Sequence, residues 1–431
     1  MNTSLPQSEL RARLLSIEPF LNAISVFIMA TIFLYWDASR AIYVLFSMAA
    51  LVFLVKFRPE MPSEHRLYSW PIIGFVGAAV LSLLFNGVPD GGINRLGSRF
   101  FLLLIAIPLV SIFYLSFDPK RNVWIKYAVG CMALGGLALV DALFLDVSRA
   151  GGGHNPSAFG FAALAMTSIT AGSYHRFSQI RFGRAIFFLA ILMGVCAMML
   201  SGARTSWLAG VAVVIVAMFF YMERYSLFKR VLLTLTLIVG IAIVSSSLPQ
   251  VQKRFNIMID ITAPYVTGEE QTGFNSLSTR VELWKVAWQV GMENKIFGYG
   301  VGKTKRVIKD YGQQNSYLKR RGKKNGHFHN QFLQTFAMTG LVGLVSFLVL
   351  IICHFWIFAK YLGKQYSLEV RCLALSGLLL LISYLVKSIP GVPFYGKQYL
   401  MMYGFASASI WGCLLGALRE PGPVANKLDD D

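Results

Sequence analysis

Charged side chains are scarce in this sequence. They make up 14% of its 431 residues, whereas 55% are hydrophobic, and the mean hydropathy is +0.57. A soluble protein of this size carries roughly 25% charged residues. Apolar runs of about 17–25 residues recur along the chain, each long enough to cross a bilayer as a helix. The composition therefore excludes a soluble globular enzyme and predicts an all-α, polytopic integral membrane protein.

Acidic residues and cysteines are also few. The chain has 21 Asp and Glu against 40 Lys and Arg, and its only Asp-x-Asp sequence, a metal motif of many sugar-nucleotide transferases, is the terminal Asp429-Asp430-Asp431. The five cysteines all fall in or beside apolar runs, so no disulfide framework is predicted. The glycines of the stretch 298–302 lie in a loop predicted to be extracytoplasmic, where ATP is not available. These absences argue against a metal-dependent enzyme that uses nucleotide sugars.

The apolar runs indicate about 12 transmembrane helices. The loops on one side hold 19 Lys and Arg and the short loops opposite hold 7, so the positive-inside rule places both termini in the cytoplasm. The predicted organisation is helices one to nine over residues 1–248, a long periplasmic loop region with short helices over 249–331, helices ten to twelve over 332–418 and a cytoplasmic tail over 419–431. The spans are expected at roughly 17–36, 41–57, 70–87, 98–117, 122–145, 156–174, 184–200, 205–222, 230–248, 332–359, 370–389 and 399–417.

The long loop carries a surplus of positive charge. It holds 14 Lys and Arg against six acids, a net charge of +8 that orientation in the membrane does not explain. An anionic partner at the outer face, such as a phosphorylated lipid or a polyanionic glycan, would explain it. A solvated loop facing lipid headgroups is the alternative. The densest part of the surplus is the run Lys319, Arg320, Arg321, Lys323 and Lys324.

Two arginines stand where helices are expected to begin. The sequence Thr279-Arg280-Val281-Glu282 fits a capping box, which places Arg280 in the first turn of a loop helix, where free N–H groups favour an anion. Arg204 joins two spans with almost no loop, so it lies at or just below the outer membrane surface. The alternatives are an interfacial helix whose tryptophans touch headgroups and, for Arg204, a side chain that snorkels to water.

Histidines precede two other predicted spans. Asn155 suits an N-cap with Pro156 in the first helical position, and Asn330 suits a second cap. His327 and His329 are two residues apart, as in some metal sites, but no cysteine and few carboxylates stand nearby. A histidine at a helix mouth beside cations stays neutral and can accept a proton from a hydroxyl. A structural role for each histidine remains the alternative.

Taken together, these segments resemble the O-antigen ligase family, within the wider O-antigen ligase/polymerase superfamily of bacterial envelope glycosyltransferases. The predicted layout, with a long outer loop before the tenth span, is also similar, so the resemblance covers essentially the whole chain. The segments that carry it are Ser201-Gly202-Ala203-Arg204, Arg280-Val281-Glu282-Leu283-Trp284, Gly298-Tyr299-Gly300-Val301-Gly302, His329-Asn330-Gln331-Phe332-Leu333 and Gly340-Leu341-Val342-Gly343.

The resemblance implies a GT-C-like, inverting glycosyltransferase of the inner membrane, active at the periplasmic face in lipopolysaccharide biosynthesis, without metal or cofactor. Its donor would be a glycan on undecaprenyl pyrophosphate and its acceptor a sugar hydroxyl of lipid A–core, with membrane lipids around it and no nucleic acid. By motif match, Arg204 and Arg280 would bind the pyrophosphate and His329 would be catalytic. Additional candidates for substrate binding are Arg95, Arg99, His154, Asn155, His327, Asn330 and Lys387, with the run Lys319–Lys324 for the acceptor.

One geometric expectation and three alternatives follow. Arg204, Arg280 and His329 should line one outward-facing cavity, with functional groups within roughly 10–12 Å of one another. The alternatives in the same superfamily are an O-antigen polymerase and a protein O-oligosaccharyltransferase. A non-catalytic transporter of lipid-linked glycan is a different class, and it predicts ionisable residues deep in the spans. Those nearest to that description are Lys126, Asp141 and Lys387.

Overall fold

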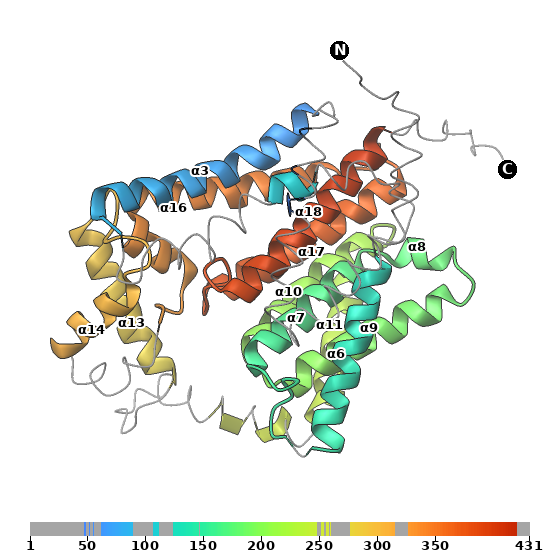
Figure 1. Ribbon diagram of the computed structural model, residues 1–431. Coiled ribbons are helices and arrows are strands. Elements are labelled where there is room, and N and C mark those ends of the chain that lie inside the picture. The colour runs from blue at the N-terminus through green and yellow to red at the C-terminus, as the bar shows by residue number, and fades with distance from the viewer. Residues whose placement is uncertain are drawn as a thin grey trace, which may run out of the picture.

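The computed structural model describes residues 62–88, 107–111, 124–145, 147–247, 276–314 and 326–419, together with short isolated pieces at 47–48, 51, 55, 251–253, 256–257 and 259. Within these ranges the regular secondary structure is entirely α-helical (Figure 1). Eight of the described helices are long and apolar enough to span a membrane. The chain is therefore an all-α, multi-pass membrane protein, as its composition predicts.

Nine of the predicted spans coincide with described helices, and α7 is the shortest of these at 16 residues. The predicted spans 17–36, 41–57 and 98–117 lie wholly or mostly outside the described residues. The nine helices are α3 (Ser63–Asn86), α6 (Ile125–Leu143), α7 (Pro156–Ala171), α9 (Gly183–Leu200), α10 (Arg204–Tyr221), α11 (Leu227–Ser246), α16 (Gln331–Lys360), α17 (Leu368–Ser388) and α18 (Lys397–Arg419).

Helices α17 and α18 form the centre of the bundle. They pack against each other, α17 also contacts α7, α10 and α16, and α16 lies along α3 (Figure 1). The large side chains of Tyr384, Tyr403 and Trp411 are completely buried here. In contrast, α11 is apolar and mostly exposed, as expected for a helix that contacts lipid. A short helix, α8 (Tyr174–Ser178), connects α7 to α9.

The predicted caps at two helix starts are confirmed. The Asn155 side chain accepts a hydrogen bond from Ser157 N–H at 2.9 Å, and Pro156 takes the first position of α7. The Asn330 side chain accepts one from Leu333 N–H at 3.0 Å at the start of α16. Each bond satisfies a backbone donor that a helix leaves unpaired at its N-terminus.

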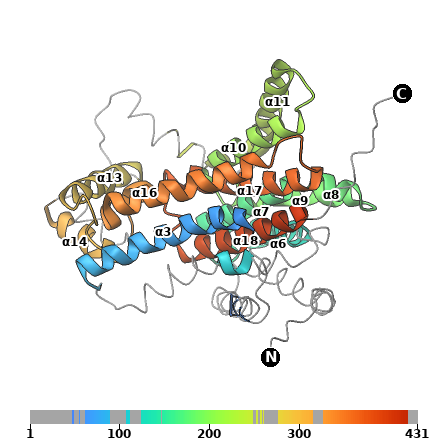
Figure 2. The ribbon, with the colours of Figure 1, turned by 90° about the horizontal axis from the view of Figure 1, so that it is seen from above.

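The long loop contributes a second, smaller hydrophobic core. Its described helices are α13 (Ser276–Glu293) and α14 (Thr304–Gln314), and we call residues 276–314 the loop unit. Apolar side chains of the loop unit pack with Phe328 and with Ala337 and Met338 of α16. The loop unit lies at the end of α16 where that helix begins, as both views show (Figure 1, Figure 2).

The backbone of the loop unit inserts into a break in α16. Gly340 has φ 66° and ψ −162°, which interrupts the helix between its first segment, residues 331–339, and the remainder. Ala337 and Met338 offer their carbonyls to the N–H groups of Tyr299 and Gly300, at 2.9 and 3.1 Å. A Cβ at Gly340 would lie 2.2 Å from the Ile296 carbonyl oxygen, so only glycine fits here. The glycine-rich stretch 298–302 therefore allows the backbone of the loop unit to pack closely against the backbone of α16.

Candidate functional site

His327 and His329 form a compact pair immediately before α16. Their ring centroids are 4.1 Å apart and the rings are nearly perpendicular. His329 has φ 55°, a left-handed conformation that costs a non-glycine residue about 1–3 kcal/mol and persists only where neighbours enforce it. The Trp284 indole N–H of α13 donates to the His329 carbonyl at 3.4 Å. Phe328, which lies between the two histidines in sequence, has its side chain fully buried in the second core.

Both imidazoles are held neutral by their surroundings. Burial is the main reason that the pKa of His329 falls from 6.5 to about 3, and electrostatic interactions with His327, Arg280 and Lys387 lower it further. The pKa of His327 is lowered by burial and by the charges of Arg280 and Lys387. A neutral imidazole has one nitrogen free to accept a proton. The His327 Nδ1 atom is buried and has no hydrogen-bond partner among the described residues.

Arg280 and Arg204 lie close enough for their charges to interact. Burial is the main reason that the pKa of Arg280 is lowered, and the positive charge of Arg204 lowers it further. Arg280 belongs to the loop unit, whereas Arg204 is the first residue of α10 in the bundle. The structure therefore brings Arg204, Arg280 and His329 to the same end of the bundle. The predicted separation of their functional groups and their shared cavity stay predictions.

Lys387 is the third cation of the group and lies one residue before the end of α17. Its Nζ donates to the Thr205 hydroxyl at 2.7 Å, directly beside Arg204. The same ammonium lies 5.6 Å from the Phe161 ring centroid and 5.8 Å from that of Tyr399. Hydroxyl and aromatic faces stabilise a cation that is only 7% exposed. The candidate substrate-binding lysine thus joins α10 and α17 at the end where His329 lies.

Arg149 is a further cation near this group, and in the sequence it counts only as one of the seven Lys and Arg of the short outer loops. Its Nε donates to the Ser201 carbonyl at 3.0 Å, and its charge acts on Lys387. The loop that carries Arg149 is fixed by Asp141, whose Oδ2 accepts the N–H groups of Gly151 and Gly152, each at 2.8 Å. The sequence offers one signal for this loop, which is the acidic residue Asp141 near the end of an apolar span, followed ten residues later by Gly151-Gly152.

The transporter alternative predicts ionisable residues deep in the spans, and three residues come nearest to that pattern in the sequence. Lys126 is the second residue of α6, Asp141 is the third from its end, and Lys387 is the second from the end of α17. None lies at the middle of its helix. This placement gives no support to a row of ionisable groups through the membrane.

The remaining candidates divide into described and undescribed residues. The Asn155 and Asn330 side chains act as caps, and His154 is exposed in the loop that contains Arg149. Substrate binding by these three stays a prediction. Arg95, Arg99, Lys319, Arg320, Arg321, Lys323 and Lys324 lie outside the described residues.

The expected start of the loop helix was wrong. We predicted Thr279 as its cap, but α13 begins at Ser276, so Arg280 lies in the second turn. Ser278 and Thr279 are each only 8% exposed, and this burial stabilises helix beyond the local capping signal. The free N–H groups of a first turn are therefore not available beside Arg280, and its guanidinium is the group that it can offer to an anion.

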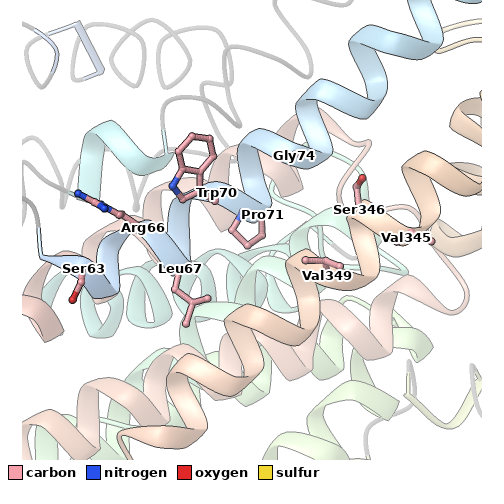
Figure 3. Close-up of a pocket in the computed structure, with 9 residues that line it drawn as sticks. All are labelled: Ser63, Arg66, Leu67, Trp70, Pro71, Gly74, Val345, Ser346 and Val349. Carbon is pink, nitrogen blue, oxygen red and sulfur yellow. The ribbon is translucent and has the colours of Figure 1, made fainter.

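Histidine, cysteine and carboxylate side chains do not gather in groups of three or more at metal-binding geometry in the described part of the chain. Independence of metal stays a prediction for experiment. A groove lies between α3 and α16 (Figure 3), and neither His327 nor His329 is among the residues that line it. It is lined by Ser63, Arg66, Leu67, Trp70, Pro71, Gly74, Val345, Ser346 and Val349, none of which is a candidate site residue.

Two comparisons relate this chain to known proteins. An uncharacterized protein of Haemophilus influenzae is 25% identical over 354 residues, which cover 79% of this chain and 85% of that protein. Residues 188–348 match the family model described as O-antigen ligase. The matched region includes Arg204, Arg280 and His329, together with the loop unit and the break at Gly340. The match over residues 188–348 supports membership of the O-antigen ligase superfamily.

Proposed function

We propose that this protein is an O-antigen ligase, a glycosyltransferase of the bacterial inner membrane. It moves a glycan from undecaprenyl pyrophosphate to a sugar hydroxyl of lipid A–core at the periplasmic face. The observation that carries the proposal is a neutral, half-buried His329 at the same end of the bundle as Arg204, Arg280 and Lys387. The positive-inside distribution of Lys and Arg supports the periplasmic orientation.

The cations would bind the pyrophosphate of the donor. The pyrophosphate of a lipid-linked glycan carries several negative charges and becomes the leaving group. Planar guanidinium groups match phosphate oxygens, and their charge stabilises the transition state where negative charge develops. Arg204 and Lys387 approach from the bundle and Arg280 from the loop unit, so the pyrophosphate would be bound between them. The apolar surfaces of the spans would hold the polyprenyl tail.

His329 would activate the acceptor hydroxyl. Its imidazole takes the proton of the acceptor hydroxyl as the oxygen attacks the anomeric carbon. The new glycosidic bond forms from the face opposite the pyrophosphate, which inverts the configuration. The bond from the anomeric carbon to the pyrophosphate oxygen breaks, and its electron pair leaves with undecaprenyl pyrophosphate. The proton on His329 then passes to solvent. The pair of carboxylates that glycoside hydrolases use is not needed.

The test uses purified protein in lipid nanodiscs with a lipid-linked glycan as donor. Lipid A–core and free glycan are offered as separate acceptors, and products are resolved by gel shift. Transfer to lipid A–core supports the ligase, transfer to free glycan supports the polymerase alternative, and no product with either acceptor contradicts both. His329→Ala should lower transfer by about 10²–10⁴-fold, the usual contribution of a general base, while donor binding persists. His327→Ala should cost much less, and equal effects of the two would contradict the assignment.

A further inference from the structure

Two buried glutamines follow the histidine pair on one face of α16. Gln331 and Gln334 are three residues apart, so their side chains lie above one another on the helix. Each is only 2% exposed. A buried amide is costly unless its hydrogen bonds are satisfied, so the partners of these two side chains are informative.

Gln334 joins the histidine segment to the loop unit. Its Oε1 accepts the Phe328 N–H at 3.0 Å, the amide between the two histidines. Its Nε2 donates to the Thr304 hydroxyl at 2.8 Å, and Thr304 is the first residue of α14. Arg280 belongs to the same loop unit as Thr304. One side chain therefore ties the backbone of the histidine pair to the body that carries Arg280.

Gln331 joins the same segment to the bundle. Its Oε1 accepts the Phe394 N–H at 3.1 Å, and its Nε2 bonds to the Thr335 hydroxyl at 3.2 Å. Phe394 lies between α17 and α18, seven residues after Lys387, and its buried ring packs against Tyr384 and Tyr403. The anchor on this side is thus the centre of the bundle.

We propose that Gln331 and Gln334 are positioning residues, which set the distances from His329 to Lys387 and to Arg280 respectively. The inference rests on the proposed function, because it concerns the same histidine and cations. It explains how a histidine is kept at φ 55°, since the N–H of Phe328, one residue earlier, and the carbonyl of His329 are both hydrogen bonded. It also explains why two polar side chains are buried where apolar ones would pack more cheaply.

The experiment replaces each glutamine by methionine, which preserves length and removes both hydrogen-bonding groups. Gln334→Met should lower kcat by about 10²-fold, the cost of misplacing a catalytic group by roughly 1 Å, while the donor KM changes little. Hydrogen exchange of peptides that span 326–333 should become faster. Gln331→Met should act on kcat in the same way and speed exchange around Phe394.

Two controls separate positioning from folding. Gln289→Met alters an exposed glutamine of α13 that bonds Glu293, and it should change neither exchange nor kcat. Thr304→Ser keeps the hydroxyl that Gln334 uses and should behave as the unaltered protein. Thr304→Val removes it and should reproduce part of the Gln334→Met effect. If the glutamine variants do not fold, the comparison of Thr304→Ser with Thr304→Val tests the positioning role of Gln334.

The experiment distinguishes failure of the positioning role from failure of the proposed function. Variants that lower the melting temperature but keep kcat in the folded fraction would overturn the proposal, as would unchanged exchange at Phe328 in Gln334→Met. If the unaltered protein transfers no glycan to any acceptor, the proposed function fails. Faster exchange at Phe328 in Gln334→Met but not in Gln289→Met would then still establish that Gln334 holds the histidine segment.

Discussion

Occupation of the site by the donor should raise the pKa of His329. In the protein without donor, burial is the main cause that holds it at about 3, and electrostatic interactions with His327, Arg280 and Lys387 add to this. An imidazole with that pKa is neutral at pH 7 but a weak base, and catalysis by a base is most effective when its pKa is near the working pH. A bound pyrophosphate would offset the charges of Arg280 and Lys387 and so strengthen the base at the moment it is needed.

The size of this effect follows from Coulomb's law. A single negative charge about 5 Å from the ring, at an effective dielectric constant near 20, contributes roughly 3 kcal/mol and moves a pKa by about 2. A pyrophosphate carries more than one charge, whereas burial of the ring remains. We therefore expect the pKa of His329 in the donor complex between about 5 and 7.

Two measurements test this. The acid limb of kcat/KM reports the free protein and that of kcat reports the complex. The kcat limb should thus lie at distinctly higher pH than the limb that His329 gives to kcat/KM. Titration of ¹³C-labelled histidine by NMR, with His329→Gln for assignment, should show the same change when lipid-linked glycan is added. A His329 signal that stays neutral down to about pH 3 in the complex would refute the role of base.

Stability should depend on pH for the same reason. The folded-state pKa of His329 lies below its value of 6.5 in an unfolded chain, so the unfolded state binds the proton first as the pH falls. The contribution of this residue is fully present above pH 6.5 and is lost as the pH falls toward 3. The melting temperature of the protein without donor should therefore decrease through this window, and less steeply in His329→Gln. Equal slopes in the two proteins would contradict the stated environment.

Three other predictions concern cations and metal. Arg149→Gln should raise the donor KM more than it lowers kcat, because a nearby charge is lost while the histidine remains, whereas Arg176→Gln at the opposite end of the bundle should change neither. Neutralising Lys319, Arg320, Arg321, Lys323 and Lys324 together should raise the KM for lipid A–core more than it lowers kcat and should flatten its salt dependence, since screened attraction is the proposed effect; an unchanged KM would support a loop that only faces headgroups. Transfer should persist in EDTA, since the arginines are proposed to take the place of a metal ion at the pyrophosphate. Activity that is lost on chelation and restored by Mg²⁺ or Mn²⁺ would contradict this.

Sequence reasoning succeeded where short-range physics decides. The apolar runs predicted nine described helices because hydrophobic length and bilayer thickness must match. Asn155 and Asn330 were predicted as caps because a cap bonds to N–H groups two or three residues away. Sequence reasoning was wrong about the start of α13, because the burial of Ser278 and Thr279 extends that helix beyond its local signal.

The tertiary structure decided which polar groups meet. The sequence by itself determined the class of protein, most of the spans and the three residues matched to the superfamily. It did not indicate that Lys387 bonds to Thr205, which lies 182 positions earlier, or that Arg149 bonds to the Ser201 carbonyl and interacts electrostatically with Lys387. Nor did it reveal the break at Gly340, which depends on a loop carbonyl entering an apolar helix. Periodicity and caps are set by neighbours within a few residues, whereas charge clusters and backbone insertions are set by the packing of distant segments.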